Sequence, residues 1–243
     1  MGRISVVLLI IQFLFIPSYA LDACVINSYS IPPAQYIEKK FKEIWKKRGN
    51  HLDCSSYDVK VLIGTPAVVK SLKESGNYRR VYTFVLFPEV MHLDKKENFY
   101  GVRIFPLPEK TYLRFLNKFH LKKSKVAVPL SKKLLNIGKI YLPKSDFIII
   151  TFNRSPVEIF SKLEKYKYIY IFPDPSLLKT FNLISLINFA SQNNIKVFSG
   201  IFDLKKFNLT YVDNVDFDQL VNDLILLSEG KIHSKILPCP CKQ

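Results

Sequence analysis

The stretch DVKVLIGTPAVVKSLKES, residues 58–75, contains the unit from which this chain is built. Its first half is a short apolar run that predicts a strand, and its second half predicts a helix. The turn Gly64-Thr65-Pro66 predicts the start of that helix, with Thr65 as N-cap and Pro66 at the first helical position. The turn lacks the residue spacing of a P-loop, but the helix end remains a candidate for holding a ligand.

The same order of strand, polar residue, proline and helix returns later in the chain. Residues 147–156 read FIIITFNRSP, and residues 168–175 read YIYIFPDP. Ser155 and Glu158 have the spacing of a capping box, in which each side chain bonds a free backbone N–H of the helix start. An earlier helix follows Pro33, carries Ala34, Ile37, Phe41, Ile44 and Trp45 on one face, and ends at Gly49.

The strands are continuous apolar runs without polar alternation, so both faces of each sheet must be covered. Strands of this kind that alternate with helices predict parallel sheets with right-handed crossovers. Prolines at 106 and 108, before a fresh amphipathic helix with Tyr112, Leu113, Leu116 and Phe119, predict a crossing between two lobes near residues 101–109. We therefore expect an α/β fold with two Rossmann-like lobes joined by hinge crossings.

This pattern gives a domain division. Lobe one is expected to hold strands near 25–28, 59–63 and 81–86, and lobe two strands near 125–128, 147–152, 168–172 and 196–199. The expected ranges are 1–20 for a signal peptide, 21–104 plus about 201–232 for lobe one, 105–200 for lobe two and 233–243 for a Cys-Pro-Cys tail.

The N-terminal segment predicts export. Arg3 supplies a positive charge, Val6 to Ile16 is apolar, and Ser18-Tyr19-Ala20 fits a cleavage site. The apolar run ends at Pro17, short of the roughly twenty residues that span a bilayer. Leu21-Asp22-Ala23-Cys24 also resembles a lipobox, so two routes remain open: cleavage after Ala20, or a lipid anchor at Cys24 in a periplasmic or envelope-associated protein.

Export makes the four cysteines candidates for disulfide bonds. Cys239-Pro240-Cys241 is too tight to close on itself with ease, so Cys24 or Cys54 is expected to pair with a tail cysteine or with each other. The tail lacks further Cys or His at zinc-site spacing, and no metal or cofactor is predicted.

The charge is strongly basic, with 36 Lys and Arg against 20 Asp and Glu and a net charge of +16. In a cytosolic protein this would suggest a nucleic-acid partner. Export argues against such a partner, and the lysines are spread along the sequence. We interpret them as a solvated surface with some attraction to anionic membranes or solutes.

The order of these segments resembles the substrate-binding proteins of ABC transporters that have a type I periplasmic-binding fold, a family that includes binders of aromatic amino acids. The resemblance covers most of residues 24–232 and rests on short motifs, which are VLIGTPAVVKSL, VYTFVLFPEV, Gly101-Val102 before a helix, YIYIFPDPSLL, IKVFSGIFDL and VDFDQLVNDLILLSEGKI. It implies that a small solute, such as an amino acid, is enclosed between the carboxyl edges of two sheets and delivered to a membrane permease.

The resemblance, with the turns and aromatic residues noted above, gives a set of candidate ligand-binding residues. They are Ser28, Tyr29, Ser30, Gly64, Thr65, Pro66, Phe87, Asn153, Arg154, Ser155, Asp174 and Phe202. Arg154 would pair with a carboxylate, while Tyr29, Phe84, Phe87 and Phe202 would stack on an aromatic ligand or lie in the core. Asp174 would contact ligand or only cap a helix.

The sequence departs from the family in places that affect the site. Only Gly49 to Tyr57 link the first helix to the second strand, so lobe one is reduced, and residues 129–146 are short for the next unit. Phe87-Pro88 stands where relatives have Asp-Pro. Phe87 would therefore enlarge an apolar wall of the pocket or fill the pocket.

No enzymatic constellation is present. The four histidines show no His-Glu motif, and no glycine-flanked serine nucleophile or glycine-rich nucleotide fingerprint occurs. Asp213, Asp216 and Asp218 lack a calcium loop and indicate a solvated helix start near Asp216. Two hypotheses follow: an exported solute receptor, or an envelope accessory protein that keeps the fold without binding a small molecule.

Overall fold

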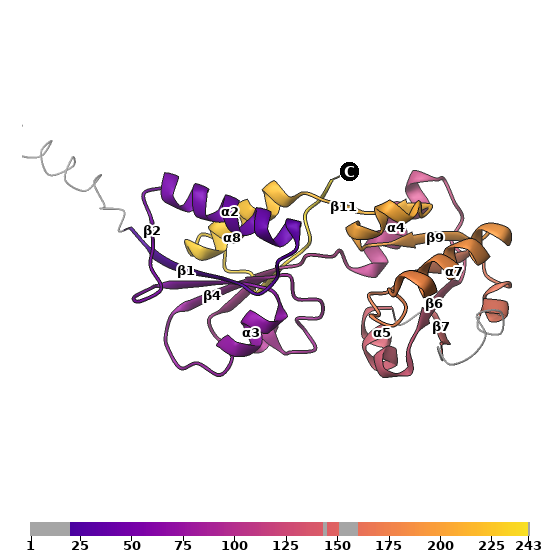
Figure 1. The fold of residues 1–243 in the computed structure, drawn as a ribbon, viewed down its shortest axis with the longest axis horizontal. Coiled ribbons are helices and arrows are strands. Elements are labelled where there is room, and N and C mark those ends of the chain that lie inside the picture. Colours follow the sequence, from indigo (N-terminus) through magenta and orange to yellow (C-terminus); the bar gives the residue numbers. More distant parts are fainter. Residues whose placement is uncertain (1–19, 143–144, 151–159, 243) are drawn as a thin grey trace, which may run out of the picture.

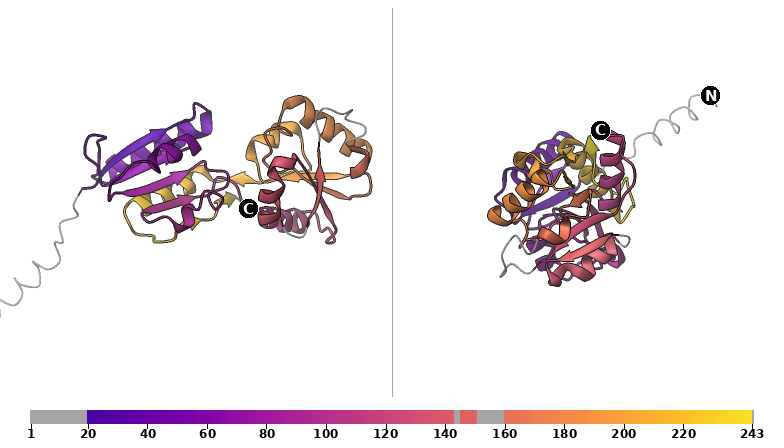
Figure 2. Two further views of the ribbon diagram at one scale, coloured as in Figure 1. Left: turned by 90° about the horizontal axis from the view of Figure 1, so that it is seen from below. Right: turned by 90° about the vertical axis from the view of Figure 1, so that its right-hand side faces the viewer.

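The computed structural model describes residues 20–142, 145–150 and 160–242, and shows two α/β lobes side by side along the long axis of the molecule (Figures 1 and 2). The expected signal peptide lies outside these residues, apart from Ala20. Each lobe is a parallel sheet covered by helices on both faces, which confirms the predicted fold class.

The first sheet has six parallel strands in the order β12-β5-β4-β3-β1-β2. Their bounds are β1 Asp22–Asn27, β2 His51–Leu52, β3 Val59–Ile63, β4 Arg79–Thr83, β5 Phe99–Val102 and β12 Ile236–Leu237. Helices α2 (Pro32–Lys47) and α8 (Phe217–Ser228) bury apolar side chains against one face. Helix α3 (Thr65–Ser71) and the 3₁₀ turn η1 (Leu93–Lys95) pack against the other.

Local signals placed several of these elements correctly. Ala34, Ile37, Phe41 and Trp45 are the buried face of α2, and Gly49 follows its end with a φ of 82°. The predicted cap at Thr65 is wrong by one residue. Gly64 is the N-cap of α3, without a side-chain cap, and Thr65 is already helical.

The second sheet has five parallel strands in the order β10-β9-β8-β6-β7. Their bounds are β6 Val126–Leu130, β7 Asp146–Ile149, β8 Tyr168–Tyr170, β9 Lys196–Ser199 and β10 Tyr211–Val212. Helices α4 (Pro108–Lys118) and α5 (Leu135–Tyr141) pack on one face through an aromatic-rich core. Helix α7 (Thr180–Gln192) packs on the other. Short 3₁₀ turns are η2 (Lys132–Leu134), η3 (Ser161–Leu163) and η4 (Phe202–Phe207).

Two helix expectations in this lobe are corrected. Helix α7 begins at Thr180 rather than at Pro175, because residues 175–178 form a turn. In α4, Leu113 and Phe119 were expected on the buried face, but they are 41% and 37% exposed, and Thr111 and Phe115 are buried instead. The Ser155–Glu158 capping box lies outside the described residues.

The chain crosses between the lobes at residues 103–107 and again at residues 213–216. The return falls later than residue 201, since β10 pairs with β9 in the second sheet. The segment expected to be a tail also contributes two strands within residues 236–242. Strand β12 pairs with β5 in the first sheet, and β13 (Cys241–Lys242) pairs with β11 (Asn214–Val215) beside the second crossing.

One disulfide bond joins Cys24 and Cys54, 30 residues apart, in the first lobe. Cys239 and Cys241 are free thiols whose Sγ atoms lie 3.5 Å apart. The pairing of Cys24 or Cys54 with a tail cysteine, which the sequence left open, is therefore excluded.

Candidate functional site

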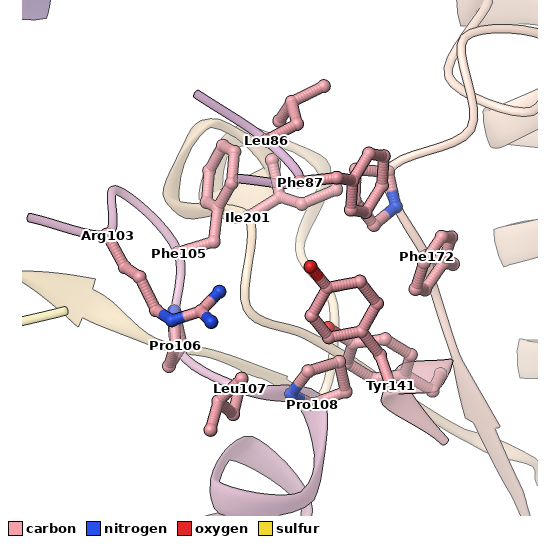
Figure 3. Close-up of a pocket in the computed structure, with 12 residues that line it drawn as sticks. Leu86, Phe87, Arg103, Phe105, Pro106, Leu107, Pro108, Tyr141, Phe172 and Ile201 are labelled. Carbon is pink, nitrogen blue, oxygen red and sulfur yellow. The ribbon is translucent and has the colours of Figure 1, made fainter. Parts of the chain in front are cut away.

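A pocket lies between the lobes, where four strands end. Strands β4 and β5 of the first sheet and β8 and β9 of the second direct their carboxyl ends toward it, the edge at which open α/β folds bind ligands. Figure 3 shows the side chains that line it. They are Leu86, Phe87, Arg103, Phe105, Pro106, Leu107, Pro108, Tyr141, Tyr170, Phe172, Pro173 and Ile201.

Aromatic rings from both lobes fill most of this pocket. Phe87, in the segment after β4, stacks on Phe172, which follows β8, with ring centroids 5.5 Å apart and planes at 14°. Phe87 also packs against Tyr141 of α5, at 5.6 Å and 41°. The free volume is about 20 Å³, room for roughly one water molecule. Phe87 therefore lies inside the pocket against Phe172, and its role toward a ligand stays a prediction.

The polar groups at the pocket form a small network across the lobes. Glu89, two residues after Phe87, forms an ion pair with Arg103 and accepts a hydrogen bond from the Tyr141 hydroxyl. Burial raises the pKa of Tyr141, and the positive charge of Arg103 opposes that rise. The guanidinium of Arg103 lies 6.0 Å from the centroid of the Tyr141 ring, and its side chain is 13% exposed. Arg103 is the one cation among the described side chains that line the pocket.

Asp174 is held by backbone groups. It is 1% exposed, and its two carboxylate oxygens accept from the N–H of Ser131 at 2.5 Å and of Ser176 at 2.8 Å. Ser131 follows β6, so Asp174 joins the turns at the ends of two neighbouring strands. These contacts show that the Asp174 carboxylate holds the two turns together. Its role in ligand binding stays a prediction.

The turns after β1 and β3 lie against each other. The Ser28 hydroxyl donates to the Ile63 carbonyl at 2.9 Å. A Cβ at Gly64 would approach the Ser28 hydroxyl oxygen to 2.4 Å and the Tyr29 ring to 2.8 Å, and φ at Gly64 is 104°. Glycine is therefore required here by packing. This explains the conspicuous Gly-Thr-Pro turn without a ligand.

The structure does not bring the remaining candidates into the pocket lining. Ser28, Tyr29, Ser30, Gly64, Thr65, Pro66 and Phe202 are not among the lining residues. Tyr29 packs edge-on against Phe84, and Phe202 stacks on Phe105, which does line the pocket. Asn153, Arg154 and Ser155 lie outside the described residues.

Several lining residues were not predicted, among them Arg103, Phe105, Tyr141, Phe172 and Ile201. Arg103 and Ile201 each come shortly after a strand end, and that signal was available for both. Tyr141 had no such signal, because it is the last residue of helix α5 and does not follow a strand.

The second crossing between the lobes contains a buried carboxylate. Asp213 is 1% exposed and accepts from the Thr111 hydroxyl at 2.6 Å, from two guanidinium nitrogens of Arg114 at 2.6 and 2.9 Å, and from the Tyr211 hydroxyl at 2.8 Å. The solvated role predicted for the acidic cluster is wrong for Asp213. It is correct for Asp216, whose side chain caps α8 by accepting from the Gln219 N–H at 3.1 Å.

The described ranges contain no group of three or more His, Cys, Asp and Glu side chains that would hold a metal ion. No helix in the same ranges is long and apolar enough to span a bilayer.

The fold has clear counterparts among solved structures. A ligand-free, open substrate-binding protein with adhesive properties from Clostridium difficile superposes with a TM-score of 0.67 at 15% identity, over 91% of this chain and 89% of the other. An ABC domain in complex with L-Trp from Streptococcus pneumonia gives 0.56 at 12%, over 91% and 88%. A glucose-galactose binding protein from Geobacillus stearothermophilus gives 0.52 at 12%, over 92% and 96%.

No protein-family profile matches the sequence, and no curated protein does. The similar structures establish the two-lobe type I periplasmic-binding fold, which is the fold that the resemblance implied. The three are described as binding proteins or as bound to a small molecule.

Proposed function

We propose that this protein is an exported receptor that binds a small organic solute between its two lobes and delivers it to a membrane transporter of the ABC class. The observation that carries the proposal is the pocket at which the carboxyl ends of β4, β5, β8 and β9 meet. The names of the similar structures, which include a substrate-binding protein and an L-Trp complex, support it.

The lining residues favour an aromatic solute that carries an anionic group. Phe87, Phe172 and Tyr141 offer ring faces for stacking, and Arg103 offers a planar guanidinium that matches a carboxylate. In the structure the Arg103 guanidinium forms an ion pair with the carboxylate of Glu89. A ligand carboxylate would replace Glu89 there, and the Tyr141 hydroxyl would be free to contact the ligand.

Binding requires a rearrangement, because about 20 Å³ does not hold an amino acid. The Phe87 ring must leave the face of Phe172. Opening of the lobes about the crossings at residues 103–107 and 213–216 would carry the segment after β4, with Phe87, away from Phe172. Loss of the contacts of Glu89 with Arg103 and Tyr141 would accompany that opening.

The test is thermal unfolding against aromatic amino acids, aliphatic amino acids, nucleosides and sugars. A ligand at one hundred times its Kd adds roughly 2.7 kcal/mol, which for a chain of this size raises Tm by about 5 to 10 °C. The shift should be lost in Arg103→Gln and kept in Arg48→Gln, whose guanidinium pairs with Glu229 on the surface of lobe one.

A second candidate is the same fold without small-molecule binding, acting through protein contacts at the envelope. The stacking of Phe87 on Phe172 favours this second candidate, because the two rings take up space in the pocket. Absence of any shift across the panel, in wild type and in a Phe87→Ala variant whose pocket is emptied, would support this candidate and contradict the receptor.

The structure also bears on processing. The Cys24 Sγ is bonded to Cys54, so it has no valence left for a lipid thioether. Cleavage before Cys24 would remove Asp22 and Ala23, which pair with β2 and β3. We therefore propose cleavage upstream of Leu21, without lipidation. Intact mass of protein purified from its host would contradict this if it showed a diacylglycerol adduct at Cys24.

A further inference from the structure

Lysines that are far apart in the sequence gather at the amino-terminal edge of the second sheet. Val126 pairs with Tyr168, and Tyr168 pairs with Lys196, so the starts of β6, β8 and β9 lie side by side. The residues there are Lys122, Lys123, Lys125, Lys165, Lys167 and Lys196, all exposed, and we call them the basic edge.

Backbone contacts hold this arrangement together. The N–H of Lys196 donates to the carbonyl of Lys167 at 3.0 Å. The Tyr168 hydroxyl donates to the carbonyl of Lys122 at 3.0 Å. The segment before β6 and the strand β9 are thus fixed beside the start of β8. The lysines are therefore neighbours because the strands that carry them pair in the sheet.

The positive charge of the edge is poorly neutralised. Within the described part of the chain, Lys125 is the one member with an ion pair, to Asp146 at 3.9 Å, and both side chains are well exposed. Like charges held at short spacing repel one another, and an external anionic surface removes that repulsion.

The position and surroundings of the edge suit a membrane surface. The strands direct their carboxyl ends toward the inter-lobe pocket, and the basic edge lies at their opposite ends. Leu113, which is 41% exposed, lines a groove of about 650 Å³ whose charged side chains are Lys123, Lys125 and one carboxylate, Glu109. Apolar side chains beside lysines are typical of surfaces that contact lipid headgroups and the acyl boundary.

We propose that the basic edge docks this protein onto an anionic lipid membrane. The six residues of the basic edge are all lysines, whose compact, strongly hydrated charges suit diffuse attraction to headgroups. A lysine near an anionic bilayer adds about 1 kcal/mol of attraction, roughly fivefold in affinity. The inference does not depend on solute binding in the pocket.

Cosedimentation of the full chain with vesicles tests the proposal. Vesicles of phosphatidylcholine alone are compared with vesicles that also contain phosphatidylglycerol. We expect binding to the anionic vesicles that weakens as salt rises. In the variant Lys122→Glu, Lys123→Glu, Lys167→Glu, the partition coefficient should fall at least about tenfold.

The matched control is Lys70→Glu, Lys73→Glu, Lys95→Glu in lobe one, which has the same net charge. All three of its lysines are exposed and have no ion pair within the described ranges. It should lose much less binding than the edge variant. Because the N-terminal segment is common to all the proteins, differences between them report on the lysines, and unfolding curves check that each variant folds.

Three outcomes would overturn the proposal. Equal loss in the two triple variants would assign the attraction to net charge alone. Equal binding of wild type to both kinds of vesicle would assign it to apolar contact. Binding to duplex nucleic acid that is tighter than to anionic vesicles, and lost in the edge variant, would assign the edge to a nucleic-acid partner.

Discussion

Phe87, from the first lobe, stacks on Phe172, from the second, with ring centroids 5.5 Å apart and an interplanar angle of 14°. The contact joins the carboxyl ends of two sheets that have no strand in common. It occupies the position that we propose for the solute, so the two rings proposed to bind a ligand are in contact with each other in this structure.

Removal of the Phe87 ring should open the pocket at a moderate cost in stability. Phe87 is half-buried, so we expect Phe87→Ala to lower the free energy of unfolding by roughly 1 to 2 kcal/mol, below the range for a fully buried phenylalanine. Urea denaturation measures the change. Phe181→Ala, at a ring 70% exposed, should stay within about 0.5 kcal/mol. Equal effects of the two changes would contradict the inter-lobe contact.

Asp174 should be required for folding stability even without ligand. In Asp174→Ala the N–H groups of Ser131 and Ser176 lose their acceptor, and we expect a loss of roughly 2 to 4 kcal/mol. The exposed Asp203 provides a matched control, for which Asp203→Ala should change stability by less than about 0.5 kcal/mol. An unchanged denaturation midpoint in Asp174→Ala would show that the carboxylate is dispensable to the fold.

The disulfide should stabilise the first lobe. It closes a loop with a separation of 30 residues, for which loop closure predicts about 3 to 4 kcal/mol. Cys24→Ala with Cys54→Ala should lower stability by about that amount, and a reductant should lower the Tm of wild type but not of this variant. The control, Cys239→Ala with Cys241→Ala, removes two free thiols and should retain the response to reductant.

The buried Asp213 should be sensitive to loss of its charge. Asp213→Ala leaves the Arg114 guanidinium without its carboxylate and the hydroxyls of Thr111 and Tyr211 without their acceptor. We expect a loss of roughly 3 to 5 kcal/mol. Thermal unfolding measures it, with Asp218→Ala at an exposed helix position as the comparison; a loss no larger than that of Asp218→Ala would refute the assignment.

Alkaline pH should weaken the fold through Tyr211. Burial, together with its hydrogen bond to Asp213, raises the pKa of Tyr211 to about 12 from the ordinary 10. The folded state therefore holds this proton more tightly than the unfolded state, so the contribution to stability is complete below about pH 10 and is lost as pH rises toward about 12. Urea midpoints measured across this range should fall less steeply in Tyr211→Phe. Parallel curves for the two proteins would contradict the raised pKa.

The sequence by itself determined the elements and their class. The apolar run at residues 61–63 predicted a buried strand, Gly49 ended α2, and Asp216 capped α8, because each of these effects acts within a few residues of the chain. Alternation of such strands with helices was then enough to predict two parallel-sheet lobes, since parallel strands need crossovers.

Only the tertiary structure decided which residues meet. The position of one lobe relative to the other decides that Phe87 stacks on Phe172. It also decides that Glu89 contacts Tyr141 as well as Arg103. Strand register likewise placed Lys167 beside Lys196, although the lysines looked scattered along the sequence. Parallel pairing brings together residues separated by a whole crossover helix, and no pattern within one segment records which distant segment will lie next to it.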